Sequence, residues 1–306
     1  MKVRRRAGRG GPARISPWVH LFALPALLLY GLFVLYPVLT TLLNSFFAFR
    51  GMRRGAWIGL DNFVTLFTTA PLNGRVINAV RNNLIMFGGS LIMTFAAFVI
   101  AALLHQLTVG REFFKAAFFL PRLLSLIVAG FLWQLILSPR SGALNGLLAA
   151  FGLPTHAWLG TPNSALASVI AVGAWHSIGF SILVFLAAMQ AIPANLYEAA
   201  RLDGAGPVRI LFSLTLPLTR SAWMILTVLA FIGAFEAFDL VYAMQGVTGA
   251  PYYGTDTLGL LFYRLAFGGE GGTAAVGLGS ALALAMLLVM AAAAVGTLRL
   301  FRPAKD

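Results

Sequence analysis

The residues best suited to bind another protein lie in one polar segment, residues 192–220, IPANLYEAARLDGAGPVRILFSLTLPLTR. Pro193 suits the first turn of a helix, where a backbone N–H has no partner. Strong helix formers follow as far as Gly204, which fits the left-handed position just past a helix end. Pro207 can open a second short helix, and Pro217 can end it. The segment is therefore predicted to form a helix, a turn and a second helix.

The first of these helices has a composition that favours docking rather than catalysis. Ala199 and Ala200 are small, so a partner surface can approach the backbone closely, and Glu198, Arg201 and Asp203 place charges around that contact. An interfacial helix without a partner is the alternative that these residues leave open.

A second group of candidates combines acids with aromatic rings, which suits a hydroxyl-rich solute. Glu236 and Asp239 lie near the end of an apolar segment with Tyr242 close behind, and Trp175 and His176 lie in the middle of another. Polar side chains within membrane segments are costly and mark functional candidates. Carboxylates accept hydrogen bonds from sugar hydroxyls, and rings cover apolar sugar faces. The alternatives are an ion pair between Asp239 and a loop arginine, and a hydrogen-bonded packing role for His176.

The chain lacks the motifs of several enzyme classes. Its three lysines, Lys2, Lys115 and Lys305, follow Met, Phe and Ala, so it has no G-x-x-x-x-G-K-[ST] phosphate loop. Its four histidines form no i, i+4 zinc pair, and it has no cysteine. Ser280 in GLGSA could act with His176 in proteolysis, but a serine among small residues is more often a helix-packing position. We therefore expect no catalytic residue, no metal ligand and no cofactor in this chain.

The composition is that of a membrane protein. Hydrophobic residues make up 59% of the 306 residues, charged residues make up 10%, and the mean hydropathy is +0.87. A soluble domain carries about 25% charged residues. The net charge of +13 does not indicate nucleic-acid binding, because six basic residues precede the first apolar segment. In that position they orient a span and contact the anionic headgroups of membrane lipid.

Six segments are long and apolar enough to cross roughly 30 Å of bilayer hydrocarbon as helices. They are predicted at residues 19–45, 82–104, 113–137, 164–192, 221–243 and 274–298. The fold class is thus all-α and polytopic, with a basic segment (1–18), a transmembrane domain (19–298, core about 78–298) and a tail (299–306). Asp61 is expected to cap a short interfacial helix. Arg122, inside the third span, is expected to reach toward the headgroups or a partner chain.

The distribution of basic residues favours cytoplasmic termini. With the N-terminus inside, the inner segments hold 14 Lys and Arg and the outer segments hold 7. Cytoplasmic loops of membrane proteins carry such an excess. Five arginines in the first outer loop oppose this bias, but the count as a whole predicts that both termini are cytoplasmic.

The polar segment resembles a known family motif. Glu198-Ala199-Ala200, three residues, Gly204, nine residues and LTLP match the pattern E-A-A-x3-G-x9-I-x-L-P, with Leu214 for the usual Ile. This is the EAA loop, here residues 192–220, of permease subunits of ATP-binding-cassette importers. LYEAARLDGAG is close to the sugar-type, maltose-permease-like branch. The same branch is resembled by GLDNFVTLF, FFKAAFFLP, LSPRSGALNGLLAAFGL, FDLVYAM and TDTLGLLFYRLAF, whereas QGVTG departs from its Thr-x-Gly-Gly-Pro.

The resemblance implies a type I importer permease fold and a division of labour among subunits. A cytoplasmic coupling helix would carry Glu198, Ala199, Ala200, Asp203 and Gly204. A separate ATPase dimer would bind ATP and Mg, a second homologous permease would enclose the path with this chain, and an extracytoplasmic binding protein would deliver the solute. The implied location is a bacterial or archaeal cell membrane, and the implied cargo is a sugar, a polyol or a glycerol phosphate.

An ion-gradient-driven secondary transporter is the rival from another class. Such a transporter would carry inverted repeats and broken helices with ion ligands near the bilayer midplane. The sequence shows no pair of Gly- or Pro-interrupted segments at matching positions of its two halves. A membrane enzyme is disfavoured because no catalytic set is present.

Overall fold

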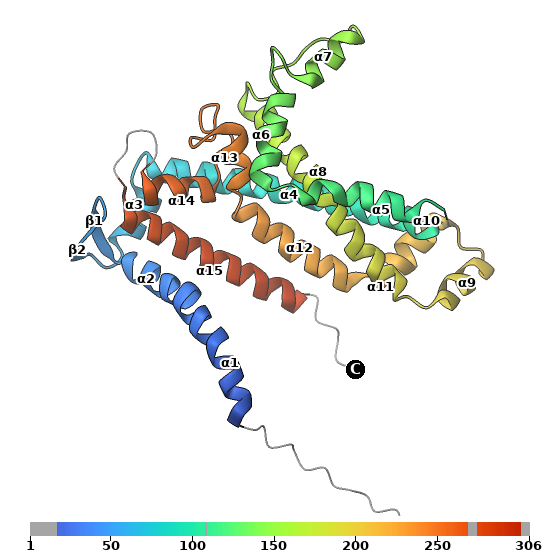
Figure 1. Ribbon diagram of the computed structural model, residues 1–306, viewed down its shortest axis with the longest axis horizontal. Helices are drawn as coiled ribbons and strands as arrows, with labels where there is room; N and C mark the ends of the chain where they lie inside the picture. The colour runs from blue at the N-terminus through green and yellow to red at the C-terminus, as the bar shows by residue number, and fades with distance from the viewer. Residues whose placement is uncertain (1–16, 108, 269–273, 301–306) are drawn as a thin grey trace, which may run out of the picture.

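The computed structural model describes residues 17–107, 109–268 and 274–300, and within these ranges the only strands form one hairpin (Figure 1). The first half of the chain contains α1 (Pro17–Tyr30), a π-helical turn (Gly31–Leu35), α2 (Tyr36–Asn44), β1 (Phe47–Arg50), β2 (Arg53–Trp57), α3 (Asp61–Thr68), α4 (Leu72–Gln106), α5 (Arg111–Phe119), a 3-10 turn (Leu120–Leu123), α6 (Leu126–Ile136) and α7 (Ala143–Ala150). The second half contains α8 (Pro162–Gln190), α9 (Ala194–Leu202), α10 (Pro207–Ile210), a π-helical turn (Leu211–Thr215), α11 (Leu216–Leu218), α12 (Arg220–Phe235), α13 (Asp239–Gln245), α14 (Leu258–Phe267) and α15 (Val276–Leu300).

Four helices are by themselves long and apolar enough to cross a membrane, namely Phe22–Asn44, Leu72–Gln106, Pro162–Gln190 and Val276–Thr297. Two more spans follow if each of two bent helix pairs counts as one. These pairs are Arg111–Leu123 with Leu126–Ile136, bent by 95°, and Pro207–Leu218 with Arg220–Phe235, bent by 72°. The predicted number of six spans agrees with this upper count.

Two of the helical runs that contain predicted spans are bent. The third predicted span breaks after the turn that contains Pro121, and the run that leads into the fifth breaks at Thr219, just after Pro217 and before the predicted start at residue 221. A proline removes one backbone hydrogen bond and crowds the preceding turn, so a helix bends or stops close to it. The fifth span also ends at Phe235 instead of residue 243, and the residues beyond form the separate helix α13.

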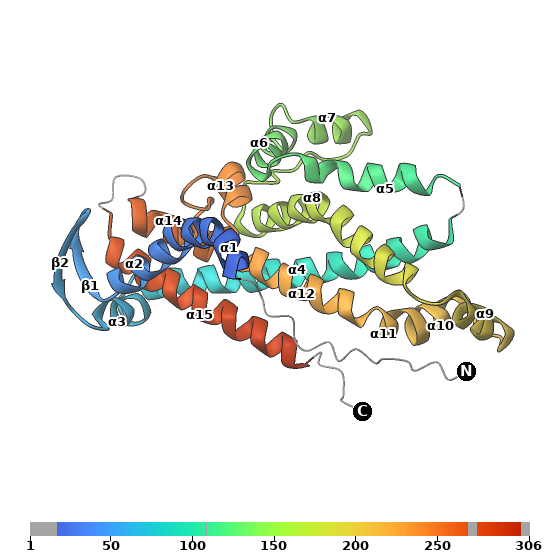
Figure 2. The ribbon, with the colours of Figure 1, turned by 60° about the horizontal axis from the view of Figure 1, so that its bottom comes forward.

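The bundle is built around α4, which packs lengthwise against α8 and α12. At this contact Phe98 of α4 and Phe185 of α8 are fully buried, with ring centroids 5.3 Å apart, and Trp223 of α12 lies against both rings. α6 packs on α13, and α15 packs on α14 and α2. Figure 1 shows α1 standing away from the bundle, and in Figure 2, where the bottom of that view comes forward, α1 lies in front of the other helices. Its described side chains are exposed.

The bundle has two ends with different architecture. The hairpin end contains β1, β2, α3 and α14, and the α9 end contains α9, α10 and α11 (Figure 1). At the hairpin end, Asn62 of α3 donates hydrogen bonds to the carbonyl oxygens of Ser45 (2.8 Å) and Phe47 (3.0 Å). Leu60, not Asp61, occupies the N-cap position of α3, so the predicted capping role of Asp61 is wrong. Asp61 lies instead in the first turn, where its charge still favours the positive end of the helix.

Candidate functional site

The helix predicted between Pro193 and Gly204 is present as α9, and it ends as the sequence indicates. Gly204 has φ +77°. The N–H of Ala205 donates to the Ala200 carbonyl (2.9 Å), and that of Gly204 donates to the Arg201 carbonyl (3.0 Å). This pair of bonds is a Schellman motif, which needs a residue in the left-handed conformation. A sharp, hydrogen-bonded turn therefore closes α9.

The face of α9 that carries the predicted docking residues is open. Glu198, Ala199, Asp203 and Gly204 are exposed and Ala200 is half-buried. Leu202, which the sequence analysis did not single out, is 89% exposed. A large apolar side chain in that state marks a contact surface when it lies among other docking residues.

The attachment of α9 to the bundle is slight. The ring of Tyr197 lies 5.9 Å from that of His105 at the end of α4, and its hydroxyl lies 3.4 Å from Thr215 Oγ1. None of the residues of α9 is buried. The helix is held by an aromatic contact on one side, while its docking face points away from the rest of the chain.

The second predicted helix is also present. It runs from Pro207 to Leu218 through α10, a π-helical turn and α11, and it ends just after Pro217, as predicted. At Thr219 it bends by 72° directly into α12. The helical run that follows the turn after α9 is therefore joined to α12 without an intervening loop.

A cavity of about 510 Å³ lies between α4, α8, α12 and the break of the third span. Its wall is mostly apolar, as is usual for solute sites, and a few polar side chains converge on it. These polar side chains are Ser90, Thr94, Arg122, His176, Ser177, Ser181 and Glu236.

The cavity brings together only two of the five predicted solute-binding residues, Glu236 and His176. Glu236 directly follows the end of α12 at Phe235 and lies on the same side as Leu229 and Gly233, which also line the cavity. Trp175 packs edge-on against Trp133, with ring centroids 5.4 Å apart.

Asp239 and Tyr242 lie outside the cavity. Asp239 is exposed at the start of α13, and among the described residues it forms no ion pair, so the alternative pairing with a loop arginine is not found. Tyr242 stacks on Phe238, with centroids 5.2 Å apart, and lies edge-on to Tyr263. The acidic and aromatic residues that were predicted to bind the solute together therefore lie in different parts of the structure.

Arg122 lies in the turn at the break of the third span, on the cavity wall. Its Nη1 is 3.4 Å from His176 Nδ1, and His176 Nε2 is 3.0 Å from the Leu124 carbonyl oxygen. A carbonyl only accepts, so Nε2 carries the proton and Nδ1 is free to accept from the guanidinium. His176 is hydrogen-bonded, as the packing alternative expected, but its partner is a charged residue of the cavity.

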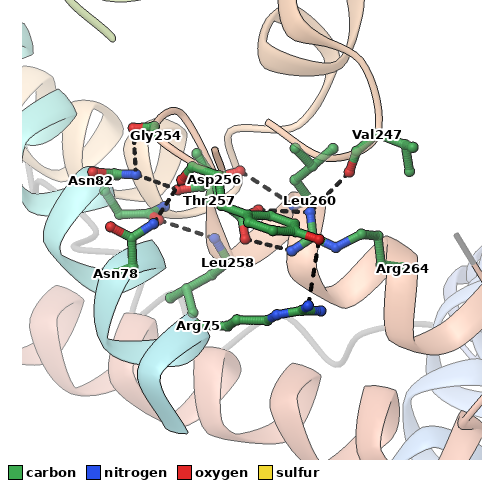
Figure 3. Close-up of polar contacts among 12 residues, drawn as sticks. Arg75, Asn78, Asn82, Val247, Gly254, Asp256, Thr257, Leu258, Leu260 and Arg264 are labelled. Carbon is green, nitrogen blue, oxygen red and sulfur yellow. Dashed lines mark hydrogen bonds and ion pairs between the residues drawn. The ribbon is translucent and has the colours of Figure 1, made fainter. Parts of the chain in front are cut away.

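A buried polar network at the hairpin end was not predicted (Figure 3). Asp256 is fully buried, and Arg264 donates to both of its carboxylate oxygens, with Nη1 2.9 Å from Oδ1. Arg264 also donates to the Val247 carbonyl (2.9 Å). Burial raises the pKa of Asp256, while the hydrogen bond and charge of Arg264 oppose that shift. The guanidinium groups of Arg264 and Arg75 both lie against the ring of Tyr253.

Two asparagines of α4 bind the backbone of Asp256 and of the residues just before it. Asn78 donates to the Tyr253 carbonyl (2.7 Å), and Asn82 donates to the carbonyls of Gly254 (3.0 Å) and Asp256 (2.9 Å). Figure 3 shows these side chains converging on the segment before α14. Arg75, Asn78 and Asn82 recur at i, i+3 and i+7, and this spacing on one helix face was the available signal. These polar residues lower the hydropathy of the first turns of α4. The second span was therefore predicted to start at residue 82, whereas the helix begins at Leu72.

Comparison with known proteins matches residues 66–302 to the family described as binding-protein-dependent transport system inner membrane component. A probable ABC transporter permease protein, YurN of Bacillus subtilis, is 33% identical over 94% of this chain and 97% of its own length. The sulfoquinovosyl glycerol permease protein SmoG of Agrobacterium fabrum is 30% identical over 92% of this chain and 89% of its own length. The sn-glycerol-3-phosphate permease protein UgpA of Escherichia coli is 32% identical over 84% of this chain and 86% of its own length.

The fold is also found among solved structures. A bacterial alginate ABC transporter, crystallised with a periplasmic protein bound to an alginate pentasaccharide, superimposes with a TM-score of 0.80. The match has 23% sequence identity and covers 93% of this chain and 94% of that one. At this identity the likeness concerns the fold, and it agrees with the importer permease fold that the motif implied.

Proposed function

The chain belongs to the inner membrane components of binding-protein-dependent transport systems and is a permease subunit of such an ABC importer; from this premise we propose that it moves a sugar or polyol by alternating access, driven by partner ATPases. As a multi-pass permease component it is not itself an enzyme. This family membership supports the resemblance drawn from the EAA loop and stands against an ion-driven secondary transporter, although two of the spans are broken.

The observation that carries the proposal is the open face of α9. Glu198, Ala199, Asp203 and Gly204 are exposed next to Leu202, while a Schellman turn makes the end of the helix rigid. In our proposal this face docks on one ATPase subunit, which binds ATP and Mg. Closure of the ATPase dimer then moves α9, and the helical run from Pro207 to Leu218 passes that movement into α12. Such coupling requires an element with two arrangements that both sites bias.

The solute path would pass through the cavity, with Glu236 and His176 as solute-binding residues. A second, homologous permease would complete the cavity wall, and an extracytoplasmic binding protein would deliver the solute at the hairpin end. Residues 1–18 and 299–306 would be cytoplasmic and residues 19–298 would form the transmembrane domain, in keeping with the excess of basic residues on that side. The loop 192–220 would then face the cytoplasm, where the ATPases are.

The cargo class is supported by the relatives. Relatives are named for the transport of sulfoquinovosyl glycerol, sn-glycerol-3-phosphate, arabinooligosaccharides and diacetylchitobiose. All of these are sugars or glycerol derivatives. A mostly apolar cavity wall with a few hydroxyl and charged groups is compatible with such molecules.

The test is transport by the complete importer in proteoliposomes. The two permeases and the ATPases are reconstituted together, the binding protein is added, and uptake of labelled sugars and polyols is measured with and without ATP. We expect uptake that needs ATP, the ATPases and the binding protein. Uptake by the permeases alone along a proton or sodium gradient would overturn the proposal.

A further inference from the structure

We propose that the cavity recognises an acidic group on the solute, with Arg122 as the anion-binding residue and His176 as the residue that positions it. The proposal rests on the solute path proposed above and narrows its cargo to a hydroxyl-bearing molecule that carries an oxyanion. Carboxylate, sulfonate and phosphate groups share the chemistry in question, since each offers two or more acceptor oxygens to a guanidinium.

The charge of Arg122 is not balanced within the chain as described. Among the described residues no carboxylate lies within ion-pair distance of it. Its contacts are the Nδ1 of His176 at 3.4 Å and the ring of Phe180, whose centroid lies 5.9 Å away. A guanidinium has five N–H donors, and the contact with His176 uses one. An unbalanced cation on the wall of a membrane-embedded cavity marks a path for a charged substrate.

The break of the third span adds positive potential on the same side. α6 begins at Leu126, and Leu126 lines the cavity together with Arg122. The first backbone N–H groups of a helix have no partner within the helix and give this end a partial positive charge. Ser125 accepts from the N–H of Val128. Half-helix N-termini at a broken span are a recurrent way of holding anionic groups within membranes.

His176 fixes the position of the guanidinium without contributing charge. Its Nε2 proton is committed to the Leu124 carbonyl, so its Nδ1 accepts from Arg122. Protonation of Nδ1 would place a cation next to a cation and remove that hydrogen bond. The histidine therefore acts as a neutral acceptor that holds the long arginine side chain against the wall.

Glu236 indicates that the solute also carries hydroxyl groups. It lines the same cavity without pairing with Arg122. A carboxylate accepts hydrogen bonds from hydroxyl groups, and it repels an oxyanion. A bound solute would therefore direct its hydroxyls to Glu236 and its acid to Arg122. A neutral sugar would leave the charge of the arginine without a counter-charge from the solute.

The first experiment measures the charge of the cavity without knowledge of the solute. The chain has no cysteine, so Ser177→Cys on the cavity wall introduces a single thiol. In the complete importer, its rate of modification is compared for an anionic (sulfonatoethyl) and a cationic (trimethylammonioethyl) methanethiosulfonate. We expect Arg122→Gln to lower the anionic-to-cationic rate ratio about tenfold, as Coulomb's law gives for one charge at close range in a partly hydrated site.

Two variants serve as matched controls for this measurement. Arg122→Lys should keep most of the ratio because the charge remains, and Arg140→Gln, an exposed arginine of a connecting segment, should leave it unchanged. Membrane abundance and co-purification of the ATPases report whether each variant is folded. An unchanged ratio in a folded Arg122→Gln importer would overturn the proposal. A thiol unreactive to both reagents would also overturn it, because the cavity would then not admit a solute.

The second experiment measures uptake by the reconstituted importer of glucuronate, sulfoquinovose and glycerol 3-phosphate against glucose and glycerol. The three acidic probes distinguish a carboxylate, a sulfonate and a phosphate. We expect ATP-dependent uptake of an acidic probe, lowered at least tenfold by Arg122→Gln. ATP-dependent uptake of neutral probes alone, unaffected by Arg122→Gln, would overturn the acidic-group proposal and leave the permease function standing. Absence of ATP-dependent uptake would instead count against the permease function.

Discussion

The hairpin end and the α9 end of the molecule satisfy their polar groups in opposite ways. At the hairpin end, Asp256 and Arg264 are buried and joined by a two-point ion pair, and asparagines of α4 bind the adjacent carbonyls. At the α9 end, the charges of Glu198 and Asp203 are exposed and make no ion pair among the described residues. Most polar groups of the first region find partners within the described part of the chain, with Asn82 Oδ1 and Arg264 Nε as exceptions, whereas the second region offers its groups to another surface.

This difference indicates that the hairpin end stabilises the fold, whereas the α9 end is available to bind a partner and to move with it. A buried network holds α4 and the segment before α14 in one arrangement, because its members have no alternative partners once water is excluded. A helix held mainly by Tyr197 can tilt or shift at little cost. Changes at the hairpin end should therefore impair folding, and changes at the α9 end should impair coupling while leaving the fold intact.

The largest effect is expected from Arg264→Met. It leaves the carboxylate of Asp256 buried without its partner, which costs about 3–5 kcal/mol. We expect a strongly reduced amount of protein in the membrane and a lower midpoint of thermal unfolding in detergent. The double variant Asp256→Asn, Arg264→Gln should recover part of the loss because no unpaired charge remains. Glu112→Gln, which breaks the exposed pair with Lys115, should change neither quantity; an equal loss there would contradict the assigned role of burial.

Gly204→Val should impair solute uptake without lowering the amount of protein in the membrane. At φ +77° a β-branched residue is strained by about 1–2 kcal/mol, which unwinds or tilts the end of α9. We expect normal membrane abundance with loss of uptake and weaker ATPase binding. Gly206→Val is the matched control, because Gly206 has φ −71° and open space at its Cβ position. Full uptake with the ATPase normally bound to Gly204→Val would remove the docking role of this turn.

Leu202→Asp tests the apolar part of the same surface. Burying a leucine at an interface contributes about 1.5–3 kcal/mol, so ATPase retention during purification should fall about tenfold or more. Glu198→Lys should act more mildly, with an effect that shrinks at high salt. Leu153→Asp, at another exposed leucine that lies after α7, should leave ATPase binding unchanged. If Leu153→Asp and Leu202→Asp behave alike, the effect is general and not local to α9.

The smallest effect is expected between the two ends, at the cavity. Glu236→Gln keeps the shape of the side chain and weakens the hydrogen bonds that it accepts from hydroxyl groups, so the apparent KM for uptake should rise about fivefold. Asp239→Asn should have little effect because Asp239 lies outside the cavity. Uptake measured over a range of solute concentrations gives the apparent KM of both variants and tests this expectation. The reverse order of effects would return Asp239 to the solute path and exclude Glu236.

The predictions from sequence were correct where a structural feature depends on residues that are close together in the chain. The extent of α9 and its left-handed end follow from Pro193, the helix formers after it and Gly204, all within one short stretch. Span number follows from apolar length. The failures concern residues whose surroundings come from elsewhere in the chain. Glu236 and Asp239 are three positions apart and look equivalent in sequence, but Glu236 directly follows the end of α12 whereas Asp239 begins α13, and only Glu236 lines the cavity.

By itself, then, the sequence determined that the chain is a polytopic membrane protein, that it has no phosphate loop, and that one polar helix with a glycine turn is available for docking. These properties depend on composition and on interactions between residues a few positions apart. Only the tertiary structure decided that Arg122 contacts His176, 54 positions away, and that the Asp256 carbonyl accepts a hydrogen bond from Asn82, 174 positions earlier. Such pairs form because a buried polar group needs a hydrogen-bond partner, and the packing of helices brings that partner from a distant part of the chain. The sequence around either residue does not predict this packing.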